Sequence, residues 1–381
     1  MPRSWKETTL GKVLAPKGYI RGPFGSALRR NELLDAGIPV YEQQHAIYGI
    51  RDFRFFISGE KYKEMQRFGT KPNDLIISCS GTLGKVSIIK EDDPNGIISQ
   101  AILLLRVNTD LILPQYLQYF FSSKEGYNAI LARSNGSVQV NISKRADIEK
   151  IPLMLPSIDE QKEIVETLGV LDAKIANNSK INHHLEQMAQ AIWSDRFGSR
   201  KRNGQLGDII ELFDFKRVPL SGNQREKMEK TYPYYGAATL MDYVNDYLFD
   251  GIYLLLGEDG TVIDDLGFPT LQYVWGKFWV NNHAHTQGRN GFTVESLYTL
   301  LKQTSVISIV TGAVQPKINQ ANLRALGVVI PSKGEMQEYN SLIEPLFTQI
   351  RENSDENLYL EKLRNAILPR LMSGRLSIVN L

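Results

Sequence analysis

The chain has 381 residues, of which 42% are apolar and 23% charged, a composition typical of a globular protein with room for two or three hydrophobic cores. Its single cysteine, Cys79, excludes an internal disulfide framework and a multi-cysteine zinc site, and it fits a reducing compartment. Neither a signal peptide nor an apolar run of about 18 residues occurs, so we expect a soluble cytoplasmic protein.

The net charge is only +2, but it is unevenly distributed along the chain. Residues 1–156 hold 21 Lys and Arg against 15 Asp and Glu, a surplus of six positive charges. Such a surplus is compatible with a polyanionic partner such as DNA, and equally with an ordinary protein surface. Charge alone therefore leaves both interpretations open.

The first segment, residues 1–156, is predicted to be rich in strands. Leu75–Ser78 and Ile97–Val107 are apolar runs typical of buried strands, and a turn sequence with Pro and Asn precedes each of them. Leu113–Phe121 carries a proline near its start and is predicted to form a helix.

A long helix is predicted over residues 157–198. Apolar residues recur there at alternating spacings of four and three, the pattern of a coiled-coil seam. Two asparagines, Asn178 and Asn182, interrupt this seam. We interpret them as residues that fix the register of a helix pair. In that case, replacing seam asparagines by leucine should raise stability while loosening the orientation of the helices. The alternative interpretation is that these asparagines lie in water at the edge of the seam.

Residues 199–331 are predicted to form a second strand-rich segment. Gly198–Gly204, which is rich in Lys and Arg, predicts a solvated linker, with a DNA-contacting arm as the alternative. Tyr253–Leu256 is predicted to be a strand, and Ser296–Lys302 is predicted to be a helix.

A second long helix is predicted over residues 332–374, followed by a tail over residues 375–381. Asn353 and Asn357 interrupt its seam as well, so that antiparallel pairing would bring the asparagines of the two helices face to face. Pro345 lies within this helix and predicts a kink or a late start. The predicted seam consists of Ile164, Leu168, Leu171, Ile175, Asn178, Asn182, Leu185, Ile343, Leu346, Ile350, Asn353, Asn357, Leu360 and Ile367.

The second half of the chain repeats the first. Gly136–Gln139 returns as Gly312–Gln315, and the proline before each long helix, Pro156 or Pro331, recurs 175 positions later. A duplicated unit implies pseudo-twofold symmetry. We therefore predict an α+β fold in which two strand-rich domains are separated by two long helices that form an antiparallel coiled coil.

No catalytic motif is complete in this sequence. The chain contains no Pro-Pro, so it lacks the Asn/Asp-Pro-Pro-Tyr signature of enzymes that methylate an exocyclic base amine. Gly81–Val86 differs from a phosphate-binding loop in glycine spacing and predicts a tight turn. His283 and His285 share one face of a predicted strand without an acidic or cysteine cluster, so we expect no metal. Cys79 has no nearby histidine and is interpreted as a core thiol.

Several short motifs resemble a known family when they are taken in order. Gly22–Leu28, Gly81–Val86 and Pro156–Gln161 in the first half, with Arg217–Ser221 and Tyr232–Gly236 in the second, are similar to the specificity subunits of type I restriction and modification systems. The resemblance extends over essentially the whole chain. The second helix departs from it, with Glu335-Met-Gln337 where the first has Glu160-Gln161, so its docking surface is expected to differ.

The resemblance implies a noncatalytic DNA-binding subunit. Each target recognition domain would bind one half of a bipartite asymmetric sequence, and the helices would set the gap and dock two methyltransferase subunits. Restriction and translocase subunits would join through that complex. S-adenosylmethionine, ATP and Mg²⁺ would belong to the partner subunits, and no membrane is implied.

Base-contacting residues do not follow from the resemblance, so we select them by chemistry. Polar and cationic residues of predicted loops are the candidates. For Gln139 and Gln315, a structural role in holding the loop backbone is an equally weighted alternative. The candidates are Arg21, Arg29, Arg30, Gln43, Gln44, Lys85, Gln100, Gln139, Asn141, Lys216, Arg217, Tyr235, His283, Gln315, Lys317 and Asn319.

Two other classes of function stay open at this point. One is a self-contained DNA-modifying enzyme, which a methyl-transfer assay on the isolated chain would reveal. The other is a protein–protein scaffold without DNA contact. Phosphate-mediated binding weakens steeply with salt, so a salt-dependent gel shift would distinguish a DNA-binding protein from a scaffold.

Overall fold

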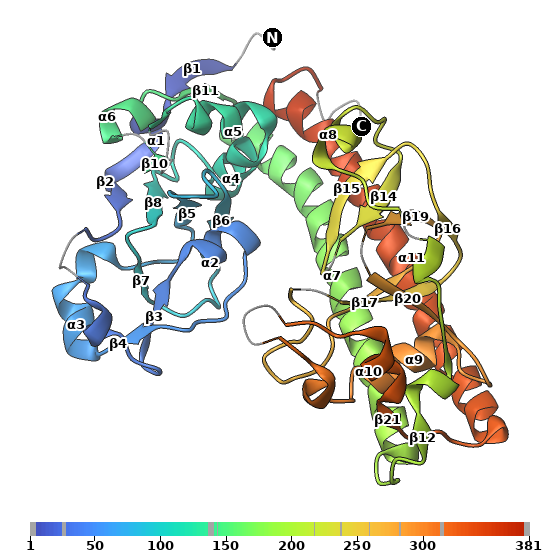
Figure 1. Cartoon of the computed structure of the whole chain (residues 1–381). Coiled ribbons are helices and arrows are strands. Elements are labelled where there is room, and N and C mark those ends of the chain that lie inside the picture. Colours follow the sequence, from blue (N-terminus) through green and yellow to red (C-terminus); the bar gives the residue numbers. More distant parts are fainter. Residues whose placement is uncertain are drawn as a thin grey trace. The chain divides into compact units, whose positions relative to one another are not determined.

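The computed structural model describes residues 5–24, 28–135, 141–142, 144–216, 218–236, 238–258, 260–281, 283–312 and 316–376, without the side chains of residues 135, 214 and 283–286. The chain divides into two compact units. Unit 1 comprises Met1–Ile175 and Leu358–Leu381, and unit 2 comprises Ala176–Asn357. Short strands and helices make up most of each unit, and two long helices contribute to both (Figure 1). This is the α+β fold that the sequence predicts.

Unit 1 is built on a four-stranded sheet in the order β2-β8-β5-β6 and a three-stranded sheet in the order β4-β3-β7. A two-stranded pair, β1 with β11, closes the segment before the long helix. The elements are β1 (Lys6–Thr9), α1 (Leu10–Val13), β2 (Leu14–Arg21), η2 (Arg30–Glu32), β3 (Ile38–Tyr41), α2 (Gln43–Tyr48), β4 (Phe56–Ile57), α3 (Gly59–Glu64), η3 (Gln66–Phe68), β5 (Leu75–Ser78), β6 (Val86–Ile88), β7 (Ile97–Ile98), β8 (Ile102–Val107), α4 (Pro114–Ser122), α5 (Lys124–Leu131), β9 (Ser134–Asn135), β10 (Asn141–Ile142), α6 (Arg145–Ile148) and β11 (Pro152–Leu155).

The central strands of unit 1 are buried on both faces. Alternate residues of β5 point to opposite sides, so that Leu75 and Ile77 belong to one hydrophobic cluster and Ile76 belongs to another. The β8 strand divides in the same way, with Leu103 and Leu104 on opposite faces. Continuous apolar runs therefore encode these strands, as is typical of strands covered on both sides.

The predicted single strand over Ile97–Val107 is wrong, because the chain bends between β7 and β8. The Ser99 amide donates to the Tyr41 carbonyl at 2.8 Å, and the Ile102 amide donates to the Ser99 carbonyl at 3.1 Å. These bonds form a turn that moves the chain from one sheet to the other and leaves Gln100 exposed at its tip. The apolar residues on both sides of the turn hid it from a pattern-based prediction.

Unit 2 repeats this arrangement. Its main sheet has the order β13-β20-β17-β18, and a second sheet has the order β15-β14-β19-β16. The elements are β12 (Gly204–Gln205), η4 (Leu206–Asp208), β13 (Ile210–Leu212), η5 (Asp214–Lys216), α8 (Gly222–Glu226), β14 (Tyr232–Tyr235), β15 (Leu240–Val244), β16 (Phe249–Asp250), β17 (Tyr253–Gly257), β18 (Leu271–Val274), β19 (Lys277–Val280), β20 (His283–Gly288), α9 (Val294–Leu301), η6 (Ile307–Ile309), α10 (Gln320–Ala325) and β21 (Gly327–Val328).

Each unit contains an equivalent backbone hydrogen bond near its start. The Leu10 amide donates to the Ile151 carbonyl at 2.9 Å, and the Leu206 amide donates to the Leu326 carbonyl at 2.8 Å. Both units also contain a parallel strand pair, β3 with β7 in unit 1 and β14 with β19 in unit 2. The sequence repeat is therefore a repeat of topology.

The long helices α7 (Ile158–Phe197) and α11 (Lys333–Met372) each contain 40 residues. They lie side by side (Figure 1), and residue numbers rise along one as they fall along the other, because Asp172 pairs with Arg364 and Asn182 pairs with Asn353. The pairing is therefore antiparallel. Every predicted seam residue is buried or partly buried.

The late start predicted from Pro345 is wrong. The α11 helix begins at Lys333 and continues through Pro345. Proline removes the hydrogen bond to the carbonyl four residues earlier, that of Ser341, but both residues lie on the exposed face of the helix. Water can therefore satisfy the freed carbonyl, and the helix tolerates the proline.

The four seam asparagines form hydrogen bonds across the helix pair. Asn178 Nδ2 donates to Asn357 Oδ1 at 3.0 Å and to Glu356 Oε2 at 2.7 Å. Asn353 Nδ2 donates to Asn182 Oδ1 at 2.8 Å, and Asn182 Nδ2 donates to the Ile350 carbonyl at 3.2 Å. Amides can make these bonds only in one register, which supports a role in alignment.

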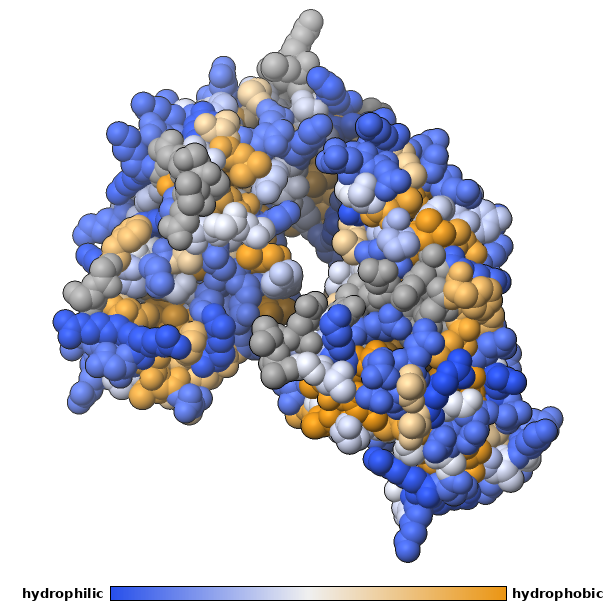
Figure 2. Space-filling view, viewed as in Figure 1, coloured by the Kyte–Doolittle hydropathy of each residue, from blue (hydrophilic) through white to orange (hydrophobic). Residues whose placement is uncertain are grey.

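The face of the molecule drawn in Figure 2 is mainly hydrophilic, with apolar residues in small separate patches. Within the described ranges, none of the helices has the length and apolar character needed to cross a membrane.

Candidate nucleic-acid interface

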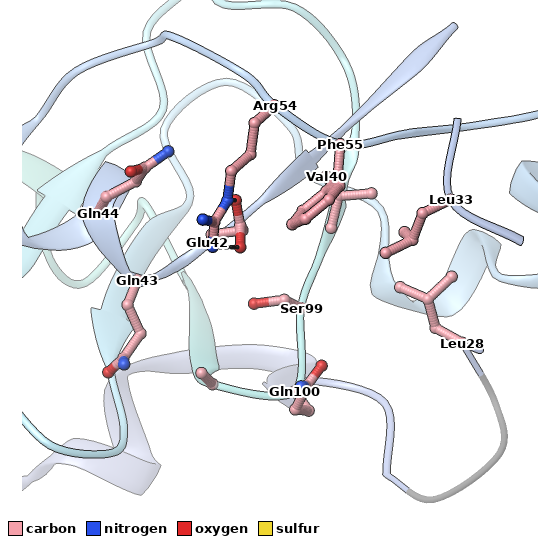
Figure 3. A pocket seen from close by; sticks show the side chains of 11 residues that line it. Leu28, Leu33, Val40, Glu42, Gln43, Gln44, Arg54, Phe55, Ser99 and Gln100 are labelled. Carbon is pink, nitrogen blue, oxygen red and sulfur yellow. Dashed lines mark hydrogen bonds and ion pairs between the residues drawn. The ribbon is translucent and has the colours of Figure 1, made fainter. Parts of the chain in front are cut away.

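A cavity of about 240 Å³ opens at one edge of unit 1, where β3 ends, α2 begins and the β7–β8 turn passes (Figure 3). Polar side chains from three separate segments line it. They include the candidates Gln43, Gln44 and Gln100, together with Glu42, Arg54 and Ser99. The neighbouring candidates Gln43 and Gln44 therefore meet Gln100, which is distant in sequence, at one site.

The start of α2 is held by a buried histidine. The Glu42 amide donates to His45 Nδ1 at 2.7 Å, which leaves Nε2–H to donate to the Asp52 carbonyl at 3.0 Å. The His45 ring stacks on Phe53 with centroids 4.6 Å apart. Burial disfavours the charged imidazolium and lowers the pKa of His45 below its ordinary value. A neutral His45 therefore fixes the backbone that carries Glu42.

Glu42 in turn binds Arg54 through two hydrogen bonds. Arg54 Nε and Nη2 donate to the two carboxylate oxygens of Glu42, each at 2.7 Å, as the dashed lines in Figure 3 mark. The guanidinium carbon also lies 4.8 Å from the centroid of the Phe55 ring. The carboxylate raises the pKa of Arg54, so the guanidinium stays charged.

The three glutamines differ in how they are held. Gln43 Oε1 accepts from the Ser80 amide at 3.2 Å, and Gln44 Nε2 donates to the Asp52 carbonyl at 3.3 Å. Gln100 lies exposed at the β7–β8 turn. An amide offers both a donor and an acceptor group, and within the described ranges the other end of each of these two amides forms no hydrogen bond.

Arg21 and Asn141 lie near the strand that precedes Ser80. Arg21 ends β2, its guanidinium carbon is 5.5 Å from the Phe24 ring, and its Nη1 is buried. Asn141 is exposed and forms a β-bridge with Ser80. The neighbouring Cys79 is fully buried, and burial raises the pKa of its thiol to about 12, as expected of an unreactive core cysteine.

The other cationic candidates of unit 1 lie away from this cavity. Lys85 Nζ lies 4.9 Å from the centroid of the Tyr127 ring and lines a separate pocket with Asn365 and Pro369. Arg29 and Arg30 are exposed at the start of η2. The structure therefore does not gather all candidates of unit 1 into one cluster.

A second, basic pocket of about 780 Å³ lies between β2 and η3. Lys17, Arg67 and Lys71 line it, together with Arg21 and Arg106. Arg106 forms an ion pair with the buried Asp74 at 2.6 Å, and burial still leaves the pKa of Asp74 raised. The remaining cations suit a polyanion, because phosphate contacts depend on charge more than on geometry.

The corresponding edge of unit 2 carries different side chains. Tyr235 ends β14, is partly buried against Phe278, and has its pKa raised by that burial. Gly236 follows, and its carbonyl accepts a hydrogen bond from Gln272 Nε2 at 2.8 Å. Lys216 is exposed, and its Nζ lies 5.6 Å from the centroid of the Phe213 ring. At the position that corresponds to Glu42, unit 2 thus has Gly236 and an amide contact in place of a glutamate that binds an arginine.

The remaining candidates of unit 2 are less informative. Asn319 accepts from the Asn322 amide at 2.8 Å and so caps α10, which explains this residue without a ligand. Lys317 is exposed beside it and forms a β-bridge with Thr311. His283 lies on β20, but its side chain is not described. Gln139, Arg217 and Gln315 lie outside the described residues.

Sequence reasoning missed the pair of Arg54 and Glu42. The two residues are 12 positions apart and belong to no motif, and only the packing of β3, α2 and β4 brings them together. Selection of polar loop residues led to the neighbouring Gln43 and Gln44 but gave no signal for Arg54.

The fold and these edges define a class of protein: a duplicated α+β chain whose two units carry related but different polar surfaces. Residues 24–187 and residues 200–361 each match the type I restriction modification DNA specificity domain. The chain belongs to this family, the specificity subunits of type I restriction-modification systems, and it contains two target recognition domains.

Individual relatives agree with this assignment. The MjaIX specificity subunit of a type I restriction enzyme from Methanocaldococcus jannaschii is 23% identical over 349 residues, which cover 81% of this chain and 78% of that protein. The EcoprrI specificity subunit from Escherichia coli is 22% identical over 307 residues, covering 74% and 73%. The crystal structure of a type I S subunit from M. genitalium has the same fold, with a TM-score of 0.54 at 18% identity and coverage of 97% and 96%.

Proposed function

We propose that the chain is the noncatalytic DNA-binding subunit of a type I complex, in which each unit binds one part of a bipartite asymmetric DNA target. The observation that carries the proposal is the family match in both halves, together with the polar edge that follows β3 in unit 1 and β14 in unit 2. Base-edge contacts from such edges would supply specificity, and exposed cations such as Lys17 and Lys71 would contact phosphates.

The helix pair would set the distance between the two bound sequences. Both helices have the same length, and the amide contacts between them permit one register. Their exposed surfaces would dock two methyltransferase subunits, through which restriction and translocase subunits would join. S-adenosylmethionine, ATP and Mg²⁺ would be bound by those partners.

The first test concerns the division of roles between units and helices. Four residues inserted into α7 near Asn178 and four into α11 near Asn353 lengthen each helix by about 6 Å, close to two base-pair steps of roughly 3.4 Å. Mapping of methylated bases should then show the same half-sites with a longer gap. The same four residues inserted into the linker at Gly198 serve as the control and should leave the gap unchanged. Altered half-sites with an unchanged gap would contradict the proposal.

The second test concerns catalysis. The sequence lacks the methyltransferase signature and a complete phosphate-binding loop, so the purified chain alone should show no methylation, nuclease or ATPase activity. Activity in any of these assays that stays with the chain through purification would contradict this prediction and would show that the chain has an active site.

A further inference from the structure

Arg54 combines exposure with immobility. Its side chain is 66% exposed, whereas an arginine on a protein surface usually retains its rotational freedom. Here the carboxylate of Glu42, itself only 16% exposed, binds two of its N–H groups, and the Phe55 ring packs against the guanidinium. The orientation of the guanidinium is therefore fixed before any ligand arrives.

The pairing with Glu42 leaves a second pair of donors. A guanidinium has five N–H groups, and Glu42 uses those of Nε and one of Nη2. Among the residues that the structure describes, none accepts a hydrogen bond from Nη1 of Arg54. One N–H of Nη1 and the remaining N–H of Nη2 are coplanar and parallel, so they can bind two neighbouring acceptors at once.

We propose that these donors bind O6 and N7 of a guanine in the major groove, so that Arg54 determines specificity for one G·C base pair of the target part bound by unit 1. Guanine is the base that presents two adjacent acceptors there. Glu42 acts as a positioning residue through Arg54. This inference rests on the proposed DNA-binding function.

The charge of the site favours a base over a phosphate. A carboxylate at 2.7 Å cancels most of the attraction that Arg54 would exert on a phosphate, whereas the edge of a base carries no net charge to repel Glu42. Gln43, Gln44 and Gln100 line the same cavity and add neutral donors and acceptors. Adjacent base pairs could therefore be contacted from the same edge.

A matched arginine is present in the same unit. Arg145 Nε donates to Glu149 Oε1 at 2.7 Å, its guanidinium carbon lies 5.5 Å from the Tyr19 ring, and its side chain is 58% exposed. It lies on α6, at the other end of unit 1 from β4 (Figure 1), and lines no part of the cavity. Arg145 is therefore also an exposed arginine that pairs with a glutamate beside an aromatic ring, but through one hydrogen bond and at a different place.

The test uses the full chain in complex with its methyltransferase subunits and a library of random DNA duplexes. Sequencing of the methylated duplexes gives the target of each variant. Arg54→Ala should reduce the preference for guanine at one position of the part bound by unit 1 by about 5- to 150-fold and leave the other positions unchanged. Arg54→Lys retains the charge without the planar pair of donors, so it should reduce the same preference for guanine. This variant provides the test if Arg54→Ala does not fold.

Two further variants separate positioning from contact. Glu42→Gln should weaken the same preference, and the double variant with Arg54→Ala should match Arg54→Ala alone, because Glu42 acts only through Arg54. Arg145→Ala should leave the target unchanged. An unchanged target in the Arg54 variants, or equal loss of methylation on all sequences, would overturn the assignment of Arg54. A wild-type complex that selects no sequence would instead refute the proposed function itself.

Discussion

Unit 1 and unit 2 can be compared at the point where the chain leaves the parallel strand pair. In unit 1 the Ser99 amide donates to the Tyr41 carbonyl at 2.8 Å, and in unit 2 the Asn281 amide donates to the Tyr235 carbonyl at 3.1 Å. The next residue is Glu42, which binds Arg54, in one unit, and Gly236, whose carbonyl binds Gln272, in the other. The backbone contact is kept while the side-chain chemistry changes.

This difference shows how one fold can serve two specificities. Backbone hydrogen bonds and buried apolar residues hold the edge, and neither depends on which polar side chains project from it. Residues such as Glu42 and Gly236 are therefore free to differ between the units. Under the proposed function, an asymmetric target would result from two equivalent scaffolds with unlike surfaces.

The helix ends differ in a similar way. Trp193 and Phe197, near the end of α7, are buried in the core of unit 2, where Trp193 packs edge-on against Tyr339 at 5.1 Å. At the same offset of 175 positions, Leu368 and Met372 of α11 are buried in the core of unit 1. Unit 2 thus holds its helix with aromatic residues and unit 1 with aliphatic ones.

The largest expected effect comes from truncating these anchors. Trp193→Ala should lower the free energy of unfolding of unit 2 by about 3–5 kcal/mol, and Leu368→Ala should lower that of unit 1 by about 2–5 kcal/mol, because each leaves a cavity in a packed core. Amide hydrogen exchange resolved by peptide would assign each loss to its unit. Val170→Ala, at a position 68% exposed on α7, is the control and should change stability by less than about 0.5 kcal/mol. Equal loss of protection in both units after either change would contradict the comparison.

An intermediate effect is expected from the seam amides. Asn182→Leu alone should cost about 1–3 kcal/mol, because the buried Asn353 amide loses the acceptor it binds at 2.8 Å. Replacing Asn182 and Asn353 together by leucine removes both polar groups and should restore or raise stability while loosening the register. Thermal unfolding of the single and double variants measures the difference. A double variant less stable than the single one would show that the bonds of these amides to other groups, such as that of Asn182 to the Ile350 carbonyl, outweigh the bond between them.

The smallest effect concerns pH and is expected in unit 1. His45 is buried and its pKa is lowered in the folded state, so the unfolded chain binds the proton more readily. The contribution of neutral His45 to the free energy of unfolding is therefore complete above the ordinary pKa of 6.5. It is lost as the pH falls from there through the pKa of the folded state. Thermal unfolding from pH 7.5 to 5.5 should show a decrease that is smaller in His45→Gln. His183 and His184, the histidines of unit 2 whose side chains are described, are exposed on α7. An equal decrease in the variant would exclude His45 as its source.

The parts of the fold that follow a period could be predicted from the sequence. The seam spacing gave both long helices to within a few residues, and the apolar runs at Leu75–Ser78 and Tyr253–Leu256 became β5 and β17. Features that depend on contacts between distant segments could not be predicted. The turn at Ser99 requires Tyr41, and the orientation of Arg54 requires Glu42, so neither leaves a local pattern.

Among the candidate site residues, local chemistry was a partial guide. Asn319 has the position of a helix cap, a role that its place before Gln320–Ala325 could have suggested. Gln43, Gln44 and Gln100 do meet at one cavity, but two of them also hold backbone groups. Residue type therefore identified a polar edge without separating binding from support.

The central claim, that each unit binds its own part of the target, is tested most directly by a fragment that ends at Ser199. This fragment contains one recognition domain and all of α7, and its exposed seam can pair with that of a second copy. Trp193 and Phe197 of the second copy would take the places of Leu368 and Met372 in the core of unit 1. Mapping of methylated bases in cells that carry the fragment in place of the full chain should give a palindrome built from the half-site of unit 1. A fragment that sediments as a stable monomer, or a methylome that retains the asymmetric target, would contradict the account.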